Sequence, residues 1–533
     1  MTLLLSGISV VPGTRREEVL SLAKRRIGAR CALPSDVSFS VFRRSVDARK
    51  RNDVRLVYTA AISGSFTERE VERLKDLGIS RLAEEMPLPT PGNDPLSAPP
   101  VVIGTGPCGM FAALLLAEAG YAPVVLERGG NVSERRRAYA RFCSDRILDP
   151  NTNIQFGAGG AGTFSDGKLV TRVNDAMTAY VLSRFVEFGA PADILTEAKP
   201  HIGTDLLTLT VDRMLARIEE LGGRVLYHTT FLSPIVSGGR ITAVRTSSGD
   251  VPCGALVLAI GHSARDTYES LLKAGVVIEP KPFSVGVRIE HLADDVDRAL
   301  YGDFAGHPDL GHAAYNFSAD TDTRGVYTFC MCPGGTVVAA ASEEGGVVVN
   351  GMSEHARAGK NSNAALAVSV FCDDYGNTPC GAIDFQRRIE RAAYAAGGGT
   401  YAAPITTVGD FLVGKEGTAP SRILPTYMDG EGVVTSSPKK YLPDFVTSSL
   451  ARGILAFDRR LVGFAAPEAV LTGAETRTSA PVRILRNADR TAIGIDNLYP
   501  AGEGAGYAGG ITSAALDGLR TAMALVARYA PVL

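Results

Sequence analysis

The chain has 533 residues, 45% of them hydrophobic and 21% charged, and its formal net charge of −2 argues against nucleic acid as the main partner. Its eight cysteines are scattered rather than packed into a small disulfide framework, and no stretch approaches the roughly 18 consecutive apolar residues of a membrane span. The N-terminus has no signal-peptide pattern, so we expect a cytoplasmic protein of several domains without a membrane partner.

Residues 1–85 alternate between extended and helical patterns. Strand-like runs cover 3–11, 37–45 and 54–63, with helical patterns at 15–29 and 67–77. This βαββα order predicts a small α+β module that is ferredoxin-like in outline. The Pro-rich composition of residues 86–100 then predicts a semi-rigid linker.

The beginning of this module is basic. Its first 60 residues contain 12 Lys or Arg against five Asp or Glu, a difference of +7. A solvated basic face is the ordinary explanation of such a balance. Docking of an acidic protein or an RNA is the alternative.

A dinucleotide-binding pattern begins directly after the linker. An apolar run at 101–103 enters a turn with Gly104, Gly106 and Gly109, and an Ala/Leu-rich helix and a second apolar run ending at Glu127 follow. The three glycines permit the tight turn, the approach of a pyrophosphate and close helix–strand packing, in that order. The helix N-terminus favours phosphate, and Glu127 is placed to accept ribose hydroxyls.

The same glycine spacing recurs twice, at 157–162 and 504–509. The first of these has no apolar strand before it, and the second opens a helix too near the C-terminus for another strand to follow. Neither meets the strand–turn–helix–strand context of a nucleotide fold. We interpret both as further walls of the site that begins at Gly104.

The dinucleotide-binding domain is predicted to be discontinuous. A helix at 205–221 is followed by a hairpin pattern at 226–234 and 241–247, and 255–261 reads as a buried strand of a parallel sheet. Strand and helix signals return together only at 497–528. The intervening region, rich in Gly and β-branched residues, is expected to be a cap or substrate domain.

This arrangement resembles the FAD domain of glutathione-reductase-type and para-hydroxybenzoate-hydroxylase-type flavoproteins. The resemblance rests on the turn ending at Glu127, on the strand 256–261, and on 497–518, where Glu503 stands in place of the usual Asp. The N–H groups at Gly509 and Gly510 would favour negative charge on the N1/O2 edge of a reduced isoalloxazine. The predicted cofactor is therefore FAD rather than NAD.

Longer stretches resemble a widespread group of bacterial and plastid FAD-dependent dehydrogenase-like proteins, and the match is nearly full-length. The stretches that carry it are 153–169, 199–205, 259–266, 281–291, 327–335 and 472–479. The resemblance implies a fold and a cofactor, but leaves the substrate class open.

The predicted fold class is α/β: a discontinuous Rossmann-like FAD-binding domain, a mixed α+β cap and the N-terminal module. The expected segments are the module (1–85), the linker (86–100), three parts of the FAD-binding domain (101–175, 205–279 and 481–533), a cap segment (176–204) and the cap or substrate domain (280–480).

The predicted FAD-contacting residues share glycine turns, strand ends or helix starts. They are Gly104, Gly106, Pro107, Cys108, Gly109, Glu127, Arg128, Gly159, Gly160, Ser165, Lys168, Phe231, Ala259, Gly261, Gly502, Glu503, Gly509, Gly510 and Ile511.

Three residues are candidates for catalysis. Cys330 and Cys332 form a Cys-X-Cys pair, yet residues i and i+2 of a regular strand are poorly spaced for a relaxed disulfide. Structural thiols, one thiol facing the flavin, and a cycling disulfide therefore all remain open. Arg477 could clamp a substrate carboxylate or make structural hydrogen bonds. No Cys or His spacing suggests a metal site.

These features predict an oxidoreductase in which hydride passes between flavin N5 and a small organic substrate lying between the FAD domain and the cap. NAD(P)H is a candidate transient electron partner, approaching from the cap side. The alternative is an FAD-bearing adaptor whose N-terminal module docks a protein or RNA. A protein partner and a homo-oligomer are both left open.

Overall fold

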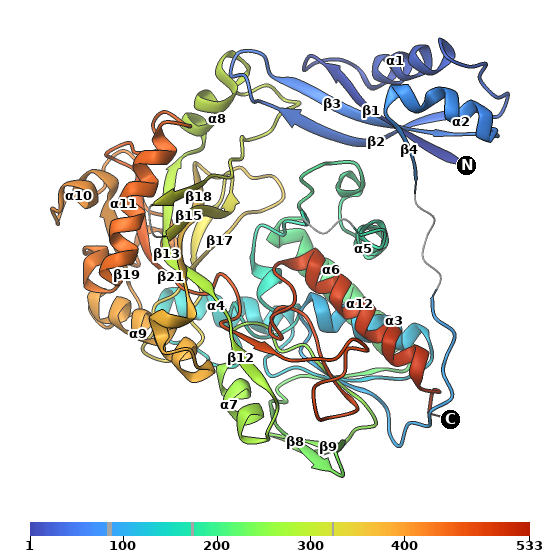
Figure 1. Ribbon diagram of the computed structural model, residues 1–533. Coiled ribbons are helices and arrows are strands. Elements are labelled where there is room, and N and C mark those ends of the chain that lie inside the picture. Colours follow the sequence, from blue (N-terminus) through green and yellow to red (C-terminus); the bar gives the residue numbers. More distant parts are fainter. Residues whose placement is uncertain (83–87, 172–174, 322–323, 533) are drawn as a thin grey trace.

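The computed structural model describes residues 1–82, 88–171, 175–321 and 324–532 (Figure 1). The N-terminal module lies at one end of the molecule, a parallel-sheet unit at the other, and a large mixed sheet alongside. The first residues of the predicted linker, 86 and 87, and residues 172–174 of the first FAD segment lie outside the described part.

The N-terminal module is a four-stranded antiparallel sheet in the order β2-β3-β1-β4, with two helices. The strands β1 and β3 have apolar residues at alternate positions, and Leu3, Leu5 and Leu56 are fully buried. The short strand β4 is an addition to the predicted βαββα order. The elements are β1 (Thr2–Val10), α1 (Arg16–Gly28), β2 (Ser38–Asp47), β3 (Arg55–Ser63), α2 (Glu68–Leu74) and β4 (Ile79–Arg81).

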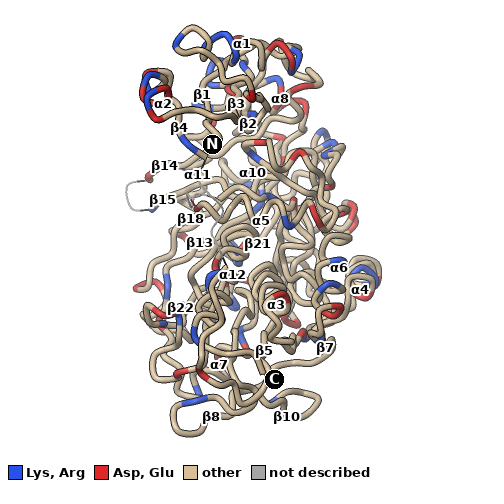
Figure 2. The backbone as a smooth tube through the Cα atoms, turned by 90° about the vertical axis from the view of Figure 1, so that its right-hand side faces the viewer, with Lys and Arg blue, Asp and Glu red and all other residues tan. Residues whose placement is uncertain are grey.

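The module is tied to the rest of the chain through a basic residue. Arg44 exchanges backbone hydrogen bonds with Thr196 and Ala198, and its side chain pairs with Glu197 at 2.8 Å. Elsewhere, Figure 2 shows Lys and Arg interleaved with Asp and Glu around α1 and α2. Docking of a partner on this module stays a prediction.

The parallel-sheet unit contains five strands in the order β23-β11-β5-β6-β7, each parallel to its neighbours. All five carboxyl ends therefore lie at one edge of the sheet. The strands are β5 (Val101–Ile103), β6 (Val124–Leu126), β7 (Arg224–Leu226), β11 (Leu256–Leu258) and β23 (Leu498–Pro500). The predicted strand within 255–261 is confirmed as a central member of this sheet.

Both faces of this sheet are covered, which explains why its strands are continuously apolar. Val102 and Val257 pack toward α3 (Pro107–Glu118), α6 (Thr204–Glu220) and α12 (Ile511–Arg528). Val101 and Leu258 pack on the other side. The elements there are β8 (Phe231–Ser237), β9 (Arg240–Thr246), β10 (Gly249–Pro252) and α7 (Arg265–Lys273).

Two sequence predictions need correction in this unit. The predicted hairpin is confirmed as the antiparallel pair β8–β9, but its first strand starts at Phe231 rather than at residue 226, because β7 ends at Leu226 inside the parallel sheet. The predicted cap segment 176–204 contains α5 (Thr178–Glu187), whose Phe185 packs against Phe111 of α3 with ring centroids 5.1 Å apart. This segment therefore packs with the parallel-sheet unit. Helix α4 (Val132–Asp145) lies before it.

The cap is built on a seven-stranded sheet in the order β14-β15-β18-β13-β21-β19-β20. Its strands are β13 (Phe283–Leu292), β14 (Ser318–Thr321), β15 (Arg324–Cys332), β18 (Asn361–Val370), β19 (Ala403–Thr407), β20 (Val433–Thr435) and β21 (Val470–Glu475). Around it lie α8 (Ala293–Tyr301), β16 (Thr336–Ala339), β17 (Val349–Met352), α9 (Pro379–Ala396), α10 (Val408–Val413) and α11 (Asp444–Asp458). The antiparallel pair of β12 (Ile278–Pro280) and β22 (Val482–Ile484) packs in the apolar cluster of the parallel-sheet unit.

The two faces of the cap sheet differ in chemistry. Val287 and Leu366 point toward α11, which covers the outer face with Ile454 and Phe457. The strand period of two turns Arg288 and Asn363 to the opposite face, where the β16–β17 ribbon packs. Figure 1 shows this second face directed toward the interior of the molecule. Polar chemistry is thus gathered on the inner face.

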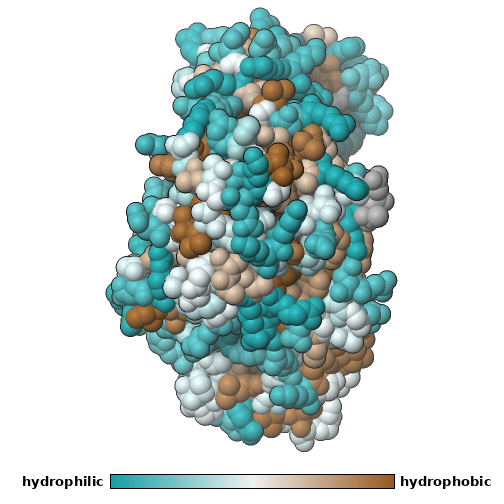
Figure 3. All heavy atoms as spheres, turned by 90° about the vertical axis from the view of Figure 1, so that its left-hand side faces the viewer, coloured by the Kyte–Doolittle hydropathy of each residue, from teal (hydrophilic) through white to brown (hydrophobic). Residues whose placement is uncertain are grey.

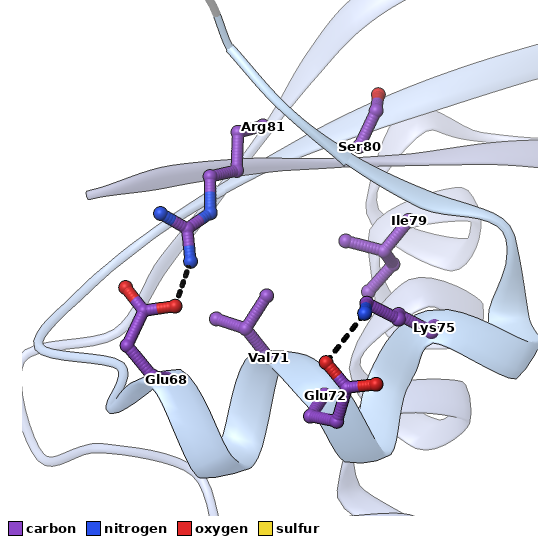
Figure 4. A pocket seen from close by; sticks show the side chains of 7 residues that line it. All are labelled: Glu68, Val71, Glu72, Lys75, Ile79, Ser80 and Arg81. Carbon is purple, nitrogen blue, oxygen red and sulfur yellow. Dashed lines mark hydrogen bonds and ion pairs between the residues drawn. The ribbon is translucent and has the colours of Figure 1, made fainter.

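The outer surfaces show fewer candidate sites than the inner face of the cap sheet. Figure 3, which views the cap side, shows hydrophobic groups separated by hydrophilic ones. A cavity of about 240 Å³ lies between α2 and β4 of the module (Figure 4), but its charged residues already pair as Glu68 with Arg81 and Glu72 with Lys75.

Within the described residues, no helix has the length and apolar character to cross a membrane.

Candidate functional site

The carboxyl edge of the parallel sheet is shaped by close backbone contacts. Gly104 follows β5 with a φ of +93°, and a Cβ there would lie 2.6 Å from the carbonyl oxygen of Ala259. A Cβ on Gly109 would lie 1.9 Å from the carbonyl oxygen of Gly104. Only glycine permits these approaches, so the turn and the start of α3 are held against the end of β11.

Two helices begin at this edge without a side-chain cap. Gly106 precedes α3 and Gly510 precedes α12, and neither helix has an acidic residue in its first turn. A Cβ built on Gly509 meets no heavy atom within 4 Å, so the space on that side is open. The N–H of Gly509, which was expected to be free, donates to the Ser513 hydroxyl at 3.1 Å. Uncapped N–H groups and the helix dipole favour negative charge at both positions.

The glycine-rich loop after α4 closes over the same place. A Cβ on Gly160 would lie 2.9 Å from the Cα of Gly106, and one on Gly162 would lie 3.1 Å from Ile511. A Cβ on Gly502 would touch the Cys108 side chain at 2.7 Å. The structure thus brings together residues from all three glycine-rich segments. Pro107 lies near Gly162 in these contacts, and the N–H of Gly159 donates to the Thr105 hydroxyl at 3.3 Å. Gly261 follows β11 and lies beside Gly504.

Glu127 ties three loops together. Its buried carboxylate accepts hydrogen bonds from the N–H of Thr105 (3.1 Å), the hydroxyl of Thr105 (2.5 Å), the N–H of Gly129 (3.0 Å) and the N–H of Gly157 (2.9 Å). Each oxygen therefore already accepts two bonds, about the capacity of a carboxylate. A ribose hydroxyl would have to share or replace one of these donors, and the ribose contact of Glu127 stays a prediction.

Other predicted cofactor residues lie around this centre in different roles. Arg128 pairs with Asp266 and lies 4.5 Å from the Phe156 ring centroid. The Ser165 hydroxyl donates to the carbonyl of Gly162 within its own loop at 2.7 Å. Phe231 is 4% exposed and packs in the apolar cluster beneath the sheet, away from the glycine turns.

A second, polar centre forms where the glycine-rich loop reaches the inner face of the cap sheet. The Lys168 ammonium donates to the carbonyl of Met331 and lies 3.8 Å from the Cys332 sulfur. Arg288 donates to the carbonyl of Cys330 at 2.7 Å, and its Nε lies 3.5 Å from Glu475. Two cations from separate elements therefore flank the Cys-X-Cys segment.

Electrostatics couple the two centres. A hydrogen bond from Cys332, together with the charges of Lys168 and Arg288, lowers the pKa of Cys330. Burial raises the pKa of Glu475 to about 7, against the opposing charge of Arg288. Burial likewise raises the pKa of Glu503 to about 7, with Lys281 opposing it and Cys330 adding to it. Glu503 starts the turn toward α12, so the thiol lies within electrostatic reach of the sheet edge.

The regular-strand geometry predicted for the Cys-X-Cys pair is wrong. Cys330 has a φ of +44°, and the pairing of β15 with β18 shifts between Phe329 and Cys332. An extra residue in β15 forms a β-bulge there, which turns the side chains from a regular alternation.

For Arg477 the structure favours one of the two roles that the sequence left open. Its guanidinium donates to Glu390 through Nε at 3.1 Å and Nη2 at 3.0 Å, and through Nη1 to Ser342. Arg265 of α7 donates to the same carboxylate at 2.7 and 2.9 Å. The bonds to Glu390 and Ser342 favour the structural hydrogen-bonding role over a substrate clamp. We call this set the Arg265–Glu390–Arg477 clamp; it joins the parallel-sheet unit to α9 of the cap.

Sequence reasoning did not single out Arg288, Asn363 or Glu475 as site residues. Two of them lie in stretches that carried the family resemblance, 281–291 and 472–479, which was the available signal. Their proximity depends on strands far apart in sequence. Among the described residues, no cluster of His, Cys, Asp and Glu could hold a metal ion.

Comparisons with known proteins identify the family to which the chain belongs. Residues 282–478 match the family described as "FAD-dependent protein, C-terminal domain-like". An uncharacterized protein of Clostridium beijerinckii is 43% identical over 499 residues, 93% of each chain. The chain is therefore a protein with an FAD-dependent-protein C-terminal domain, and it belongs to the same family as the clostridial protein.

Among solved structures, the L-amino acid deaminase of Proteus vulgaris is 13% identical, with 84% of this chain and 98% of that one covered, at a TM-score of 0.33. The glycine oxidase of Bacillus cereus is 11% identical, with 81% and 98% covered, at a TM-score of 0.34. Likenesses at this level say nothing about substrate.

Proposed function

We propose that this protein binds FAD across the carboxyl edge of its parallel sheet and acts as an oxidoreductase on a small organic substrate. The observation that carries the proposal is the pair of uncapped helix starts, at Gly106 and Gly510, on one sheet edge. The match of the cap to an FAD-dependent family supports it.

The residues present fit the parts of FAD. The start of α3, with Gly160 above Gly106, would hold the pyrophosphate, because its backbone N–H groups are uncapped and no side chain limits the approach. The open backbone at Gly509 and the start of α12 would face the isoalloxazine. When bound, FAD supplies hydride transfer at N5.

The chain itself contributes position, charge and exclusion of water. The glycine-rich loop carries Lys168 and the cap sheet carries Arg288, and both cations favour an anionic group beside the Cys-X-Cys segment. Glu475 and Glu503 have pKa values near neutrality and can hold or release a proton at their carboxyl oxygens. The Arg265–Glu390–Arg477 clamp keeps the cap on the parallel-sheet unit. NAD(P)H is a candidate electron partner that no contact described above favours.

A matched pair of substitutions tests the proposal. Gly509 and Gly28 both lack a positive φ, and at both a new Cβ would meet open space. Gly509→Ala and Gly28→Ala should therefore change the unfolding free energy of the FAD-free protein by less than about 1 kcal/mol.

Only Gly509→Ala places a methyl group where the cofactor is expected. We expect its Kd for FAD to rise at least tenfold, corresponding to about 1.4 kcal/mol, with no change for Gly28→Ala, by titration of FAD-free protein and flavin fluorescence. Equal FAD affinity in the two variants would contradict the placement at α12.

A further inference from the structure

The β-bulge at Cys330 brings two thiols together that a regular strand would keep apart. Residues i and i+2 of a strand are separated by about 6.6 Å along its axis, whereas a disulfide needs Cβ atoms roughly 3.5–4.5 Å apart. Here β15 advances from Phe329 to Cys332 while β18 moves only from Ala365 to Asn363. With Cys330 in the left-handed region, the Cys332 thiol turns back on Cys330 and donates to its carbonyl oxygen at 3.4 Å, close enough for the two sulfurs to interact.

The surroundings of the pair stabilise negative charge on sulfur. Lys168 lies 3.8 Å from the Cys332 sulfur, and Arg288 donates to the carbonyl of Cys330. The interaction with Cys332 and these cations lower the pKa of Cys330 against burial and the charge of Asp166. The interaction with Cys330 and burial raise the pKa of Cys332 although Lys168 opposes them, so the arrangement favours a thiolate on Cys330 rather than on Cys332. A thiolate beside cations is the reactive form of cysteine.

Two other buried cysteines show the contrast. Burial raises the pKa of Cys253 to about 12 and raises that of Cys108 as well, as expected of thiols that only fill space. Cys330 departs from this behaviour because its pKa is lowered, whereas the pKa of Cys332 is raised like that of the other two.

Polar atoms without a hydrogen bond adjoin the pair. Asn363, opposite Cys332 on β18, has neither amide atom hydrogen-bonded, and the Nε of Arg288 and the Oε2 of Glu475 make no hydrogen bond but form an ion pair with each other at 3.5 Å. Asn363 and Arg288 are fully buried and Glu475 is 3% exposed. Buried polar atoms of this kind normally have partners, so their grouping points to a place for polar chemistry rather than to a packed core.

We propose that Cys330 and Cys332 are a two-electron redox pair that exchanges electrons with the flavin. The proposal rests on the proposed function for the identity of the electron acceptor. The Cys330 thiolate and the Cys332 thiol form one S–S bond and release one proton and two electrons; the oxidised isoalloxazine accepts the two electrons and the proton. The reverse direction reduces the disulfide. Strain at the left-handed Cys330 is consistent with a site whose geometry serves chemistry.

The first test does not depend on the cofactor. The tryptic fragment that follows Arg324 and ends at Arg357 contains Cys330 and Cys332 and no other cysteine. Native protein is treated with diamide, free thiols are alkylated and the fragment is weighed. We expect neither cysteine of this fragment to be alkylated and the mass of the fragment to be lower by two hydrogen atoms than that of the reduced, unalkylated peptide. A fragment that keeps both alkylation sites would overturn the proposal.

The second test counts electrons in the flavin-loaded protein under anaerobic dithionite titration. We expect the wild type to consume twice as many reducing equivalents per flavin as Cys330→Ser or Cys332→Ser, and the exposed-site control Cys380→Ser to match the wild type. A wild type that takes up only two electrons per flavin would overturn the redox pair and leave the proposed function intact. Protein that binds no flavin would instead remove the proposed function, while the fragment measurement still decides whether the thiols pair.

Discussion

The Arg265–Glu390–Arg477 clamp makes a strong prediction about stability. Arg265 and Glu390 are each 1% exposed and Arg477 is 7% exposed, so the charges lie far from water. The Glu390 carboxylate accepts five hydrogen bonds, two from Arg265 at 2.9 and 2.7 Å, two from Arg477 at 3.1 and 3.0 Å, and one from Thr476 at 2.7 Å.

Glu390→Gln keeps the shape of the side chain, removes its charge and turns an amide NH2 toward guanidinium donors. Removing one partner of a buried ion pair costs about 3–5 kcal/mol, because the remaining charges stay buried without compensation. We expect the unfolding free energy to fall by about 4 kcal/mol. The control Glu343→Gln replaces a carboxylate whose side chain is 29% exposed, and it should lower the unfolding free energy by less than about 1 kcal/mol.

The assay is urea unfolding followed by far-ultraviolet circular dichroism, since the chain contains no Trp. Burial would raise the pKa of Glu390, but the charges of Arg265 and Arg477 hold it well below its usual range. The stabilisation is therefore complete above the unfolded-state pKa of about 4.3 and is lost as the pH falls below it. The difference in unfolding free energy between wild type and Glu390→Gln should therefore become smaller at acid pH. Equal midpoints for Glu390→Gln and Glu343→Gln at neutral pH would refute the reasoning.

Two further predictions concern the sheet edge. Burial would raise the pKa of Asp517, but hydrogen bonds and charges from Arg486 and Arg490 lower it to about 2, so Asp517→Asn should cost about 2 kcal/mol near neutral pH and progressively less as the pH falls from about 4 toward 2. A constant difference across that range in urea unfolding would contradict this assignment. Gly109→Ala should destabilise the protein by about 1–3 kcal/mol despite the higher helix propensity of Ala, because its Cβ would lie 1.9 Å from the carbonyl oxygen of Gly104. A thermal midpoint at or above that of the wild type would show that the turn relaxes freely.

The parts of the fold that sequence predicted well are those whose signals are local. The apolar runs at 101–103 and 124–126 coincide with β5 and β6, and the helical pattern 205–221 agrees with α6 within one residue at each end. Glycine spacing identified the sheet edge because tight turns and close packing impose it on the sequence itself. The ferredoxin-like description of the N-terminal module stays a prediction.

Predictions from sequence were wrong or stayed open where the deciding contact is distant in sequence. For Arg477 both a substrate clamp and a structural role stayed open, because its partner Glu390 lies 87 residues away on another element. The bulge at Cys330 cannot be seen in β15 alone, since it exists only relative to the register of β18. The placement of 176–204 in the cap is wrong because α5 packs against α3, and this contact cannot be seen within the segment itself. In each case the deciding partner lies outside the local pattern.

Binding of FAD at the carboxyl edge of the parallel sheet is our central claim about this protein. The most direct measurement is the flavin content of the native protein, by absorbance of the purified chain and by quantification of the FAD released on denaturation. We predict a yellow protein with flavin absorbance bands and about one FAD per chain. A colourless protein that also fails to bind added FAD would contradict the proposal that this chain is a flavoprotein.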